Sequence, residues 1–242
     1  TINEGAEKLA EALKANHTAD IILRQEAIKE LSEKPQWRQF YSATSSLVSV
    51  ETPAKLIINW LQNHKPFLPK MMQWLPLIFT LSTFVLIGLA AFNLISAALI
   101  GYWLFVGLGI SGMYLKKTNV LASNTDKVRD TFRQYASLLD LIENETFSSE
   151  LLLQKQKQIQ SDDKKASILF KEFSKALDAL DNRNNLIGAI FGNGYFLTDI
   201  KNSYKIEQWI NQHANKVSDW FEVVSFFDAY NSLGNYTFNH SR

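Results

Sequence analysis

Residues 71–115 read MMQWLPLIFTLSTFVLIGLAAFNLISAALIGYWLFVGLGISGMYL and contain no Asp, Glu, Lys, Arg or His. The whole chain has 242 residues, of which 20% are charged, so the charges are concentrated on either side of this stretch. A helix at the surface of a soluble protein needs a polar face, and residues 71–115 supply none. This stretch decides the fold, because its composition is typical of helices that lie in lipid.

The length of the uncharged stretch favours two membrane crossings joined by a tight turn. A hydrocarbon core of about 30 Å needs roughly 20 helical residues, and the stretch is about twice as long. We expect one helix from Trp74 to Ala91 and a second from Leu94 to Leu115, with the polar Asn93 in the turn. The alternative is a hairpin buried inside a soluble protein.

Basic and aromatic side chains flank the predicted hairpin. Lys70 precedes it, and Lys116 and Lys117 follow it, so the positive-inside rule places both ends in the cytoplasm. Trp74 and Tyr114 stand where interfacial aromatic residues are found. These five residues form the predicted membrane anchor, and the lipid bilayer is the first expected partner. The expected location is the inner (cytoplasmic) membrane, with a multi-pass topology.

The residues on both sides of the hairpin show the apolar periodicity of amphipathic helices. Residues 1–68 predict several short helices, and apolar residues from Val120 to Ile142 predict one long helix. The aromatic-rich final third predicts two helices, at 195–210 and 217–233, whose apolar stripes face a core. Four glycines of the second crossing would let helices approach closely: Gly101, Gly107, Gly109 and Gly112.

These patterns predict an all-α protein, a helical bundle with long lever-like helices plus a two-helix transmembrane hairpin. Residues 1–70 would form the N-terminal part of a helical core, and residues 71–117 the hairpin. Residues 118–242 would supply the lever helices and the C-terminal part of the core.

The sequence shows no group of residues with the spacing of a catalytic, nucleotide-binding or metal-binding motif. It has no GxxxxGK(S/T) phosphate loop, no cysteine, and four histidines without paired spacing. The run from Gly188 to Gly194 loosely resembles a dinucleotide fingerprint, but no predicted strand precedes it, so a turn between helices is expected. We therefore predict no catalytic, cofactor-binding or metal site, and no enzymatic activity, in this segment.

The two ends of the chain carry sequence motifs. Near the start, Gly5 is followed by RQEAIKEL at residues 24–31, and the chain closes with FDAYNSLGNYTFNH at residues 227–240. In their order and spacing these motifs resemble the core and lever region of MutS-type DNA mismatch repair ATPases. The resemblance is strongest to a MutS-related branch that carries membrane helices inside that region.

The resemblance implies a function for the longer protein to which this segment would belong. In that family a helical core joins a DNA-facing part to a C-terminal ATPase, and paired subunits clamp DNA. It implies that ATP and Mg bind in an ATPase beyond Arg242, and that the protein binds DNA as a homodimer. It places Arg24 and Glu26 in the core bundle and implies that Phe227 to Leu233 lead toward the ATPase. The motif residues with expected structural roles are Gly5, Arg24, Glu26, Phe227, Asp228, Ser232 and Leu233. Of these, Arg24, Glu26 and Asp228 are expected to fix register through hydrogen bonds.

Two features of the sequence depart from ordinary repair proteins. A turn around Ser161-Asp162-Asp163 leaves no room for the clamp domain that family members insert between their lever helices. The hairpin itself is the second departure. A net charge of +1 and a slight acidic excess after Thr118 also argue against a broad DNA-contact face. The alternative function is a membrane-tethered helical scaffold for protein partners, with no role in nucleic-acid binding.

Overall fold

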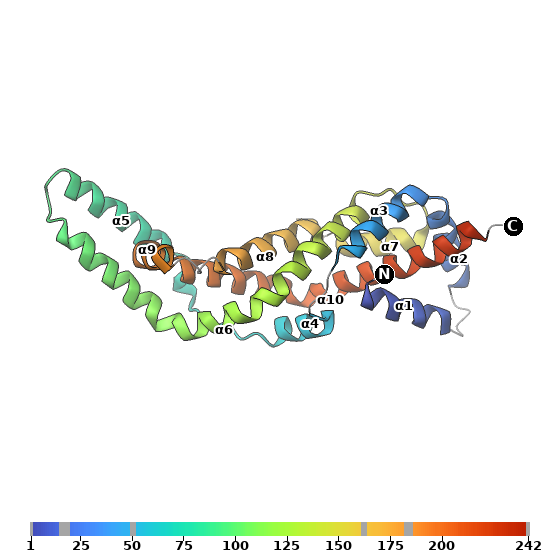
Figure 1. Cartoon of the computed structure of the whole chain (residues 1–242), viewed down its shortest axis with the longest axis horizontal. Helices are drawn as coiled ribbons and strands as arrows, with labels where there is room; N and C mark the ends of the chain where they lie inside the picture. The colour runs from blue at the N-terminus through green and yellow to red at the C-terminus, as the bar shows by residue number, and fades with distance from the viewer. Residues whose placement is uncertain (1, 15–19, 49–51, 161–163, 182–185, 241–242) are drawn as a thin grey trace. The chain divides into compact units, whose positions relative to one another are not determined.

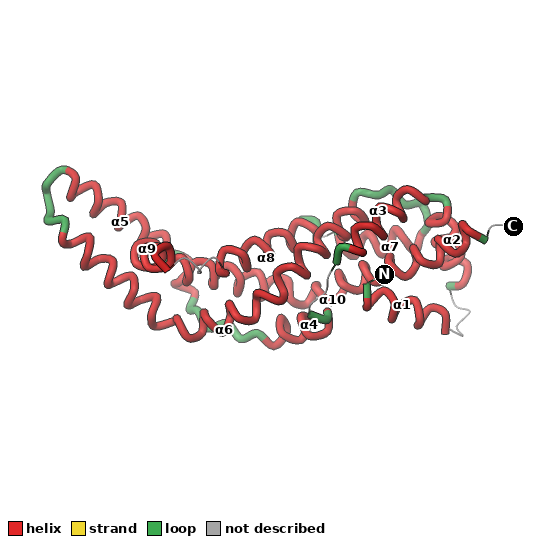
Figure 2. Tube along the Cα trace, viewed as in Figure 1, coloured by secondary structure: helices red, strands yellow, loops and turns green. Residues whose placement is uncertain are grey.

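The structure is a computed structural model that describes residues 2–14, 20–48, 52–160, 164–181 and 186–240, without the side chains of 124–127. Every regular element in these ranges is a helix (Figure 2). The β-type pairing within them is limited to an isolated antiparallel bridge between Gln160 and Lys165. The all-α prediction is therefore confirmed, whereas the predicted turn at 161–163 lies outside the described residues.

Two of the helices are much longer than the rest: α6 has 46 residues and α10 has 42. The elements, labelled in Figure 1, are α1 (Asn3–Lys14), α2 (Ile21–Ser32), α3 (Pro35–Ser46), α4 (Ala54–Asn63), the short 3-10 helix η1 (Lys70–Gln73), α5 (Leu75–Ala91), α6 (Ala98–Glu143), α7 (Glu150–Ile159), α8 (Ala166–Asp181), α9 (Leu186–Phe196) and α10 (Thr198–Asn239).

The chain divides into two compact units. Unit 1 comprises Thr1–Gln62, Asp130–Ser174 and His213–Arg242, and unit 2 comprises Asn63–Arg129 and Lys175–Gln212. Residues 71–117, expected from the sequence as a part of their own, share unit 2 with residues 175–212. The sequence pattern identifies the apolar stretch but does not reveal which later helices pack against it.

The core of unit 1 is built from aromatic side chains. The ring centroids of Phe132 and Phe170 are 4.5 Å apart, and those of Tyr135 and Phe221 are 4.6 Å apart. Trp220 packs edge-on against Phe170 at 5.5 Å, and all five side chains are buried. Because such rings remove large apolar areas from water, they dominate core energetics. The aromatic stripes are therefore core, as the periodicity predicts.

The aromatic-rich final third differs from its prediction. One helix, α10, replaces the two expected at 195–210 and 217–233, because residues 211–216 contain no Gly or Pro to interrupt it. Tyr195 and Phe196 belong instead to α9, which ends where Leu197 adopts a left-handed backbone with φ of 50°. The expected turn at 188–194 is likewise wrong, since these residues lie inside α9.

Glu30 of α2 holds the N-terminus of α7. Ser149 is the N-cap residue, but its hydroxyl makes no cap hydrogen bond. Instead the Glu30 carboxylate accepts hydrogen bonds from the backbone N–H of Ser148 (2.8 Å) and of Ser149 (2.7 Å). Burial works to raise the pKa of Glu30, but these hydrogen bonds prevail and lower it below its ordinary value of 4.5.

We expect Glu30→Ala to lower the free energy of unfolding by about 1 kcal/mol at pH 7, the usual cost of losing an N-terminal cap. Because the pKa of Glu30 is lowered on folding, its contribution is present above pH 4.5 and is lost as the pH falls through the folded-state pKa. Urea unfolding between pH 3 and pH 7 (~0.5 pH steps) measures this. Glu26→Ala, at an exposed position one turn earlier, is the matched control and should change stability by less than about 0.5 kcal/mol. Equal losses in both variants would contradict the capping role.

Candidate functional site

The uncharged stretch forms a helical hairpin in unit 2. Helix α5 begins with Pro76 in its first turn, where a missing N–H does little harm, and it ends at Ala91. Asn93 has a positive φ of 56°, a conformation that asparagine adopts more readily than most residues, and α6 begins at Ala98. The Trp103 ring stacks on Phe79 at 4.4 Å. The predicted turn at Asn93 is therefore observed, although the second helix starts four residues later than expected.

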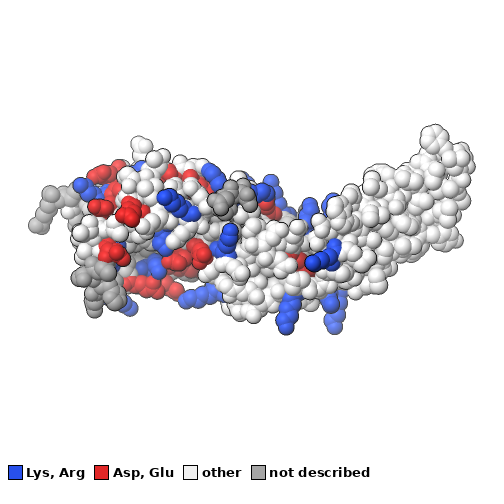
Figure 3. Space-filling view, turned by 180° about the vertical axis from the view of Figure 1, so that it is seen from behind, with Lys and Arg blue, Asp and Glu red and all other residues white. Residues whose placement is uncertain are grey.

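Large apolar side chains cover the outside of this hairpin. Figure 3 shows a wide surface without Lys, Arg, Asp or Glu, and extended exposed apolar patches mark interaction or membrane sites. Its exposed members are Leu77, Ile78, Leu81, Phe84, Val85, Ile87, Phe92, Leu94, Leu99, Tyr102, Phe105, Val106, Met113 and Leu115. Among the described residues, one helical segment, Ala98–Ser123, is long and apolar enough to cross a membrane, and α5 is a shorter apolar helix of 17 residues.

The predicted anchor residues lie at the open end of the hairpin. Trp74 is 60% exposed, and Lys70, Lys116 and Lys117 are exposed as well. Tyr114 is only half-buried and packs against a cluster that includes Leu68 and Met72. The ammonium group of Lys117 lies 5.8 Å from the centre of the Phe67 ring, at the distance of a cation–π contact. Cationic and aromatic side chains thus gather where the apolar surface ends.

Polar groups inside the hairpin are bonded to protein atoms, as an apolar environment requires. The indole N–H of Trp103 donates to Thr83 Oγ1 at 3.0 Å. Thr83 Oγ1 lies 2.9 Å from the carbonyl oxygens of both Phe79 and Tyr195. Its single hydroxyl proton can be donated to one of these two oxygens at a time. The Ser111 hydroxyl lies 3.5 Å from the Asn193 carbonyl oxygen. Two of these partners, Asn193 and Tyr195, come from α9.

Helix α9 is a third apolar element that the sequence pattern does not assign to the hairpin. A Cβ built on Gly107 would lie 2.1 Å from the Gly194 carbonyl oxygen, so the backbones of α6 and α9 meet at this point. Gly101, Gly109 and Gly112 have open space around them, so the expected close approach is realised at Gly107 alone among the four. One feature of the sequence could have marked α9 as an apolar helix like those of the hairpin. It is the uncharged run from Leu186 to Thr198, LIGAIFGNGYFLT.

The two terminal motifs meet in unit 1. The backbone N–H of Ile2 donates to Asp228 Oδ2 at 3.0 Å, and a Cβ on Gly5 would lie 2.0 Å from the same oxygen. Position 5 therefore has no room for a side chain while Asp228 keeps its place. Nearby, the Glu4 carboxylate accepts hydrogen bonds from the Ala54 backbone N–H (3.0 Å) and the Tyr135 hydroxyl (3.3 Å). Burial raises the pKa of Asp228 above its ordinary value of 3.8, although the bond from Ile2 lowers it in part.

The other motif residues have structural positions. Phe227 is fully buried, and the Ser232 hydroxyl donates to the backbone carbonyl oxygen of Asp228 at 3.2 Å. Leu233 and Arg24 are half-buried. Glu26 is exposed and takes no part in the hydrogen bonds described above. The role of Glu26 in fixing the helix register stays a prediction.

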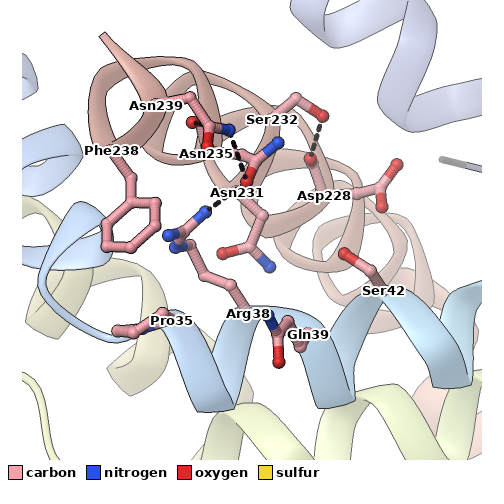
Figure 4. Close-up of a pocket in the computed structure, with 10 residues that line it drawn as sticks. All are labelled: Pro35, Arg38, Gln39, Ser42, Asp228, Asn231, Ser232, Asn235, Phe238 and Asn239. Atoms are coloured by element: carbon pink, nitrogen blue, oxygen red, sulfur yellow. Dashed lines mark hydrogen bonds between the residues drawn. The ribbon is translucent and has the colours of Figure 1, made fainter. Parts of the chain in front are cut away.

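Asp228 and Ser232 also line a polar pocket of about 410 Å³ between α3 and α10 (Figure 4). Arg38 donates from Nη1 to Asn235 Oδ1 at 3.1 Å, and its guanidinium lies 5.4 Å from the centre of the Phe238 ring. Arg38 Nε and both polar atoms of the Asn231 amide are buried without a protein partner. The pocket offers hydrogen-bond donors and an acceptor to water or to a small polar group. The lining residues are Pro35, Arg38, Gln39, Ser42, Asp228, Asn231, Ser232, Asn235, Phe238 and Asn239.

We expect Asp228→Asn to raise the free energy of unfolding at pH 7 by about 1 kcal/mol, because asparagine keeps an acceptor for Ile2 and removes a buried charge. The raised pKa means that the contribution of Asp228 is fully present below pH 3.8 and is lost as the pH rises through the folded-state pKa. The difference in free energy of unfolding between Asp228→Asn and the unaltered chain should therefore grow in favour of the variant as the pH rises. Urea unfolding at several pH values measures this difference. Asp219→Asn, at an exposed position on α10, is the control. A variant less stable than the unaltered chain at pH 7 would show that the charge itself is needed.

The described residues are all-helical, and unit 2 carries the charge-free apolar hairpin. The chain matches no protein-family model, no curated protein and no solved structure. Among the described residues, no group of three His, Cys, Asp or Glu side chains is placed to hold a metal ion.

Proposed function

We propose that the chain is the core and lever segment of a membrane-anchored MutS-like ATPase. In this proposal α5 and α6 hold the protein in the cytoplasmic membrane as a two-crossing hairpin, with both ends in the cytoplasm. The long helices transmit movement between a C-terminal ATPase, which binds ATP and Mg, and DNA held by a homodimer. The anchoring and the MutS-like role rest on separate observations.

The anchoring half is supported by the hairpin surface. Leaving a large apolar side chain in water instead of an apolar phase costs about 1.5–3 kcal/mol, and more than a dozen such side chains are exposed there. The 17 residues of α5 reach the lower end of the range of about 17–25 that a crossing needs. Lysines at the open end of the hairpin fit the cytoplasmic side, because segments of membrane proteins on that side are enriched in Lys and Arg.

The MutS-like half is supported chiefly by one contact. Ile2 and Asp228 are 226 positions apart in the sequence and share a hydrogen bond, and Gly5 is pressed against the same carboxylate. The two motifs that carry the resemblance therefore belong to one structural core. A core closed by its first and last helices is a suitable base for a domain that follows α10.

Flotation with liposomes tests the anchor. We expect the chain to float with vesicles and to need detergent to remain monodisperse in their absence. Recovery of a monodisperse monomer from detergent-free buffer would overturn the anchoring half.

Asn93→Cys, labelled with a membrane-impermeant maleimide from the far side of oriented vesicles, tests the second crossing.

The reading frame beyond Arg242 tests the ATPase half. A GxxxxGK(S/T) phosphate loop there, together with ATP hydrolysis and nucleotide-dependent DNA binding by the full-length protein, is the expected result. A full-length protein that neither hydrolyses ATP nor binds any DNA structure would refute this half and leave the anchor standing.

A second candidate function, a membrane-tethered scaffold for protein partners, is favoured by the charges of unit 1. Several lysines there pair with carboxylates, including Lys34 with Glu145 (2.7 Å) and Lys164 with Glu172 (2.8 Å). On the side that Figure 3 shows, both signs are intermixed, whereas DNA binding draws on clustered Lys and Arg. Recovery of nuclease-insensitive protein partners, with no DNA binding by the full-length protein, would select this candidate.

A further inference from the structure

Helix α9 presents an apolar face that no described part of the chain covers. Leu186 is 72% exposed, Ile187 67% and Phe191 51%, and Ile190 is exposed as well. All four lie in the N-terminal two turns of the helix. The other end, from Asn193 to Phe196, packs on the hairpin through Gly107, Thr83 and Ser111 as described above. The exposed face is thus fixed to the hairpin by the opposite end of the same helix.

The length and flanks of α9 exclude a membrane crossing. Eleven residues rise about 16 Å, roughly half of a hydrocarbon core. In the sequence, charged residues stand close to both ends, with Arg183 before the helix and Asp199 after it. A short apolar helix with charged residues near both ends in the sequence suits the boundary between lipid and water.

The orientation of α9 within unit 2 agrees with this. Figure 2 shows α9 almost end-on, whereas α5 and α6 run across the view, so α9 lies across the hairpin rather than along it. A helix that crosses a membrane-inserted hairpin in this way lies close to the plane of the bilayer. The exposed residues of α9 are uncharged, as are those of the hairpin on which its other end packs at Gly107.

We propose that α9 is an interfacial membrane helix, whose Leu186, Ile187, Ile190 and Phe191 insert into the boundary between lipid headgroups and acyl chains. This rests on the proposed membrane anchoring and extends it from a hairpin to three helices. The bilayer is the occupant that the exposed face fits, because the face carries no charge and belongs to a helix that packs on the hairpin proposed to lie in lipid.

The chain contains no cysteine, so single cysteine variants accept a spin label at one chosen position. The test uses Ile187→Cys and Phe191→Cys in liposomes, with Phe105→Cys as the hairpin reference and Glu26→Cys as the water reference. Collision with oxygen, which concentrates in lipid, is compared with collision with a water-soluble nickel complex. We expect labels at 187 and 191 to favour oxygen at least threefold over the label at 26, at a shallower depth than the label at 105.

Each result decides between the proposals. Labels at 187 and 191 that behave like the label at 26, with 105 in lipid, would overturn the α9 proposal and leave the hairpin anchor intact. If 105 also reports water, the anchoring half of the proposed function fails with it. Labels at 187 and 191 that are shielded from both reagents and show dipolar broadening between copies would assign this face to self-association and overturn the lipid contact.

Discussion

Replacing Gly107 with alanine should loosen α9 from the hairpin and lower the stability of unit 2 by about 2 kcal/mol. The new Cβ would lie 2.1 Å from the Gly194 carbonyl oxygen and 2.6 Å from its carbon, which are backbone atoms with no rotamer to move away. Overpacking of this kind costs about 1–3 kcal/mol, occasionally more, and the higher helix propensity of alanine returns at most about 1 kcal/mol. Thermal unfolding in detergent micelles should show a Tm lower by about 5 °C.

Gly109→Ala is the matched control, two residues further along α6. Nothing lies within 4 Å of a Cβ at this position, so the substitution gains helix propensity without a clash. We expect an unchanged or slightly raised Tm. Hydrogen exchange distinguishes the two further, since only Gly107→Ala should speed exchange in the second half of α9. If the two variants behave alike, α9 does not pack on the hairpin at Gly107.

The hairpin could be predicted from the sequence because its cause is local. The amino-acid composition of a segment determines whether it prefers water or lipid. The uncharged stretch between Lys70 and Lys116 therefore predicts apolar helices without reference to the rest of the chain. The turn at Asn93 is similarly local, since asparagine tolerates the left-handed backbone observed there. The start of α6, four residues later than expected, was harder to predict, because apolar composition does not mark where a helix begins.

The helices α9 and α10 show what local patterns miss. Glycines at 188, 192 and 194 suggest a turn, but a glycine also serves a helix that must approach another backbone, as Gly194 does at Gly107. Which of these two uses applies depends on a residue 87 positions away. The continuity of α10 is the opposite case, in which the absence of any breaker between Trp209 and Val217 was the better guide.

The site residues divide in the same way. Motif resemblance placed Gly5 and Asp228 in one core, and the structure shows their contact directly. The carboxylates that fix the helices were not foreseen, because Glu4 and Glu30 stand on amphipathic helices where a glutamate usually faces water. Their role appears only when the chain places backbone N–H groups opposite them. Glu26, which the motif favoured, is exposed.

Glu207 of α10 is a third glutamate whose carboxylate accepts hydrogen bonds from backbone N–H groups. Its substitution should be among those that most reduce the stability of unit 2. Its side chain is 3% exposed and accepts hydrogen bonds from the backbone N–H of Phe67 (2.8 Å) and of Leu68 (3.2 Å), and His64 Nε2 lies 3.3 Å away. Glu207→Ala leaves both N–H groups without their acceptor, at a cost of about 1–3 kcal/mol each. We expect the free energy of unfolding to fall by about 3 kcal/mol, as measured by chemical denaturation in micelles.

The position of the lost bonds makes this effect specific to the segment that leads into the hairpin. Exchange of the Phe67 and Leu68 amide protons should accelerate by about a hundredfold in Glu207→Ala, since local opening no longer breaks a bond to a buried carboxylate. Glu207→Gln retains one acceptor oxygen and should show a smaller loss. Gln208→Ala, at the exposed neighbouring position, should change stability by less than about 0.5 kcal/mol. Unchanged exchange at both amides in Glu207→Ala would mean that the segment is held by its apolar contacts with Met72 and Phe79 instead.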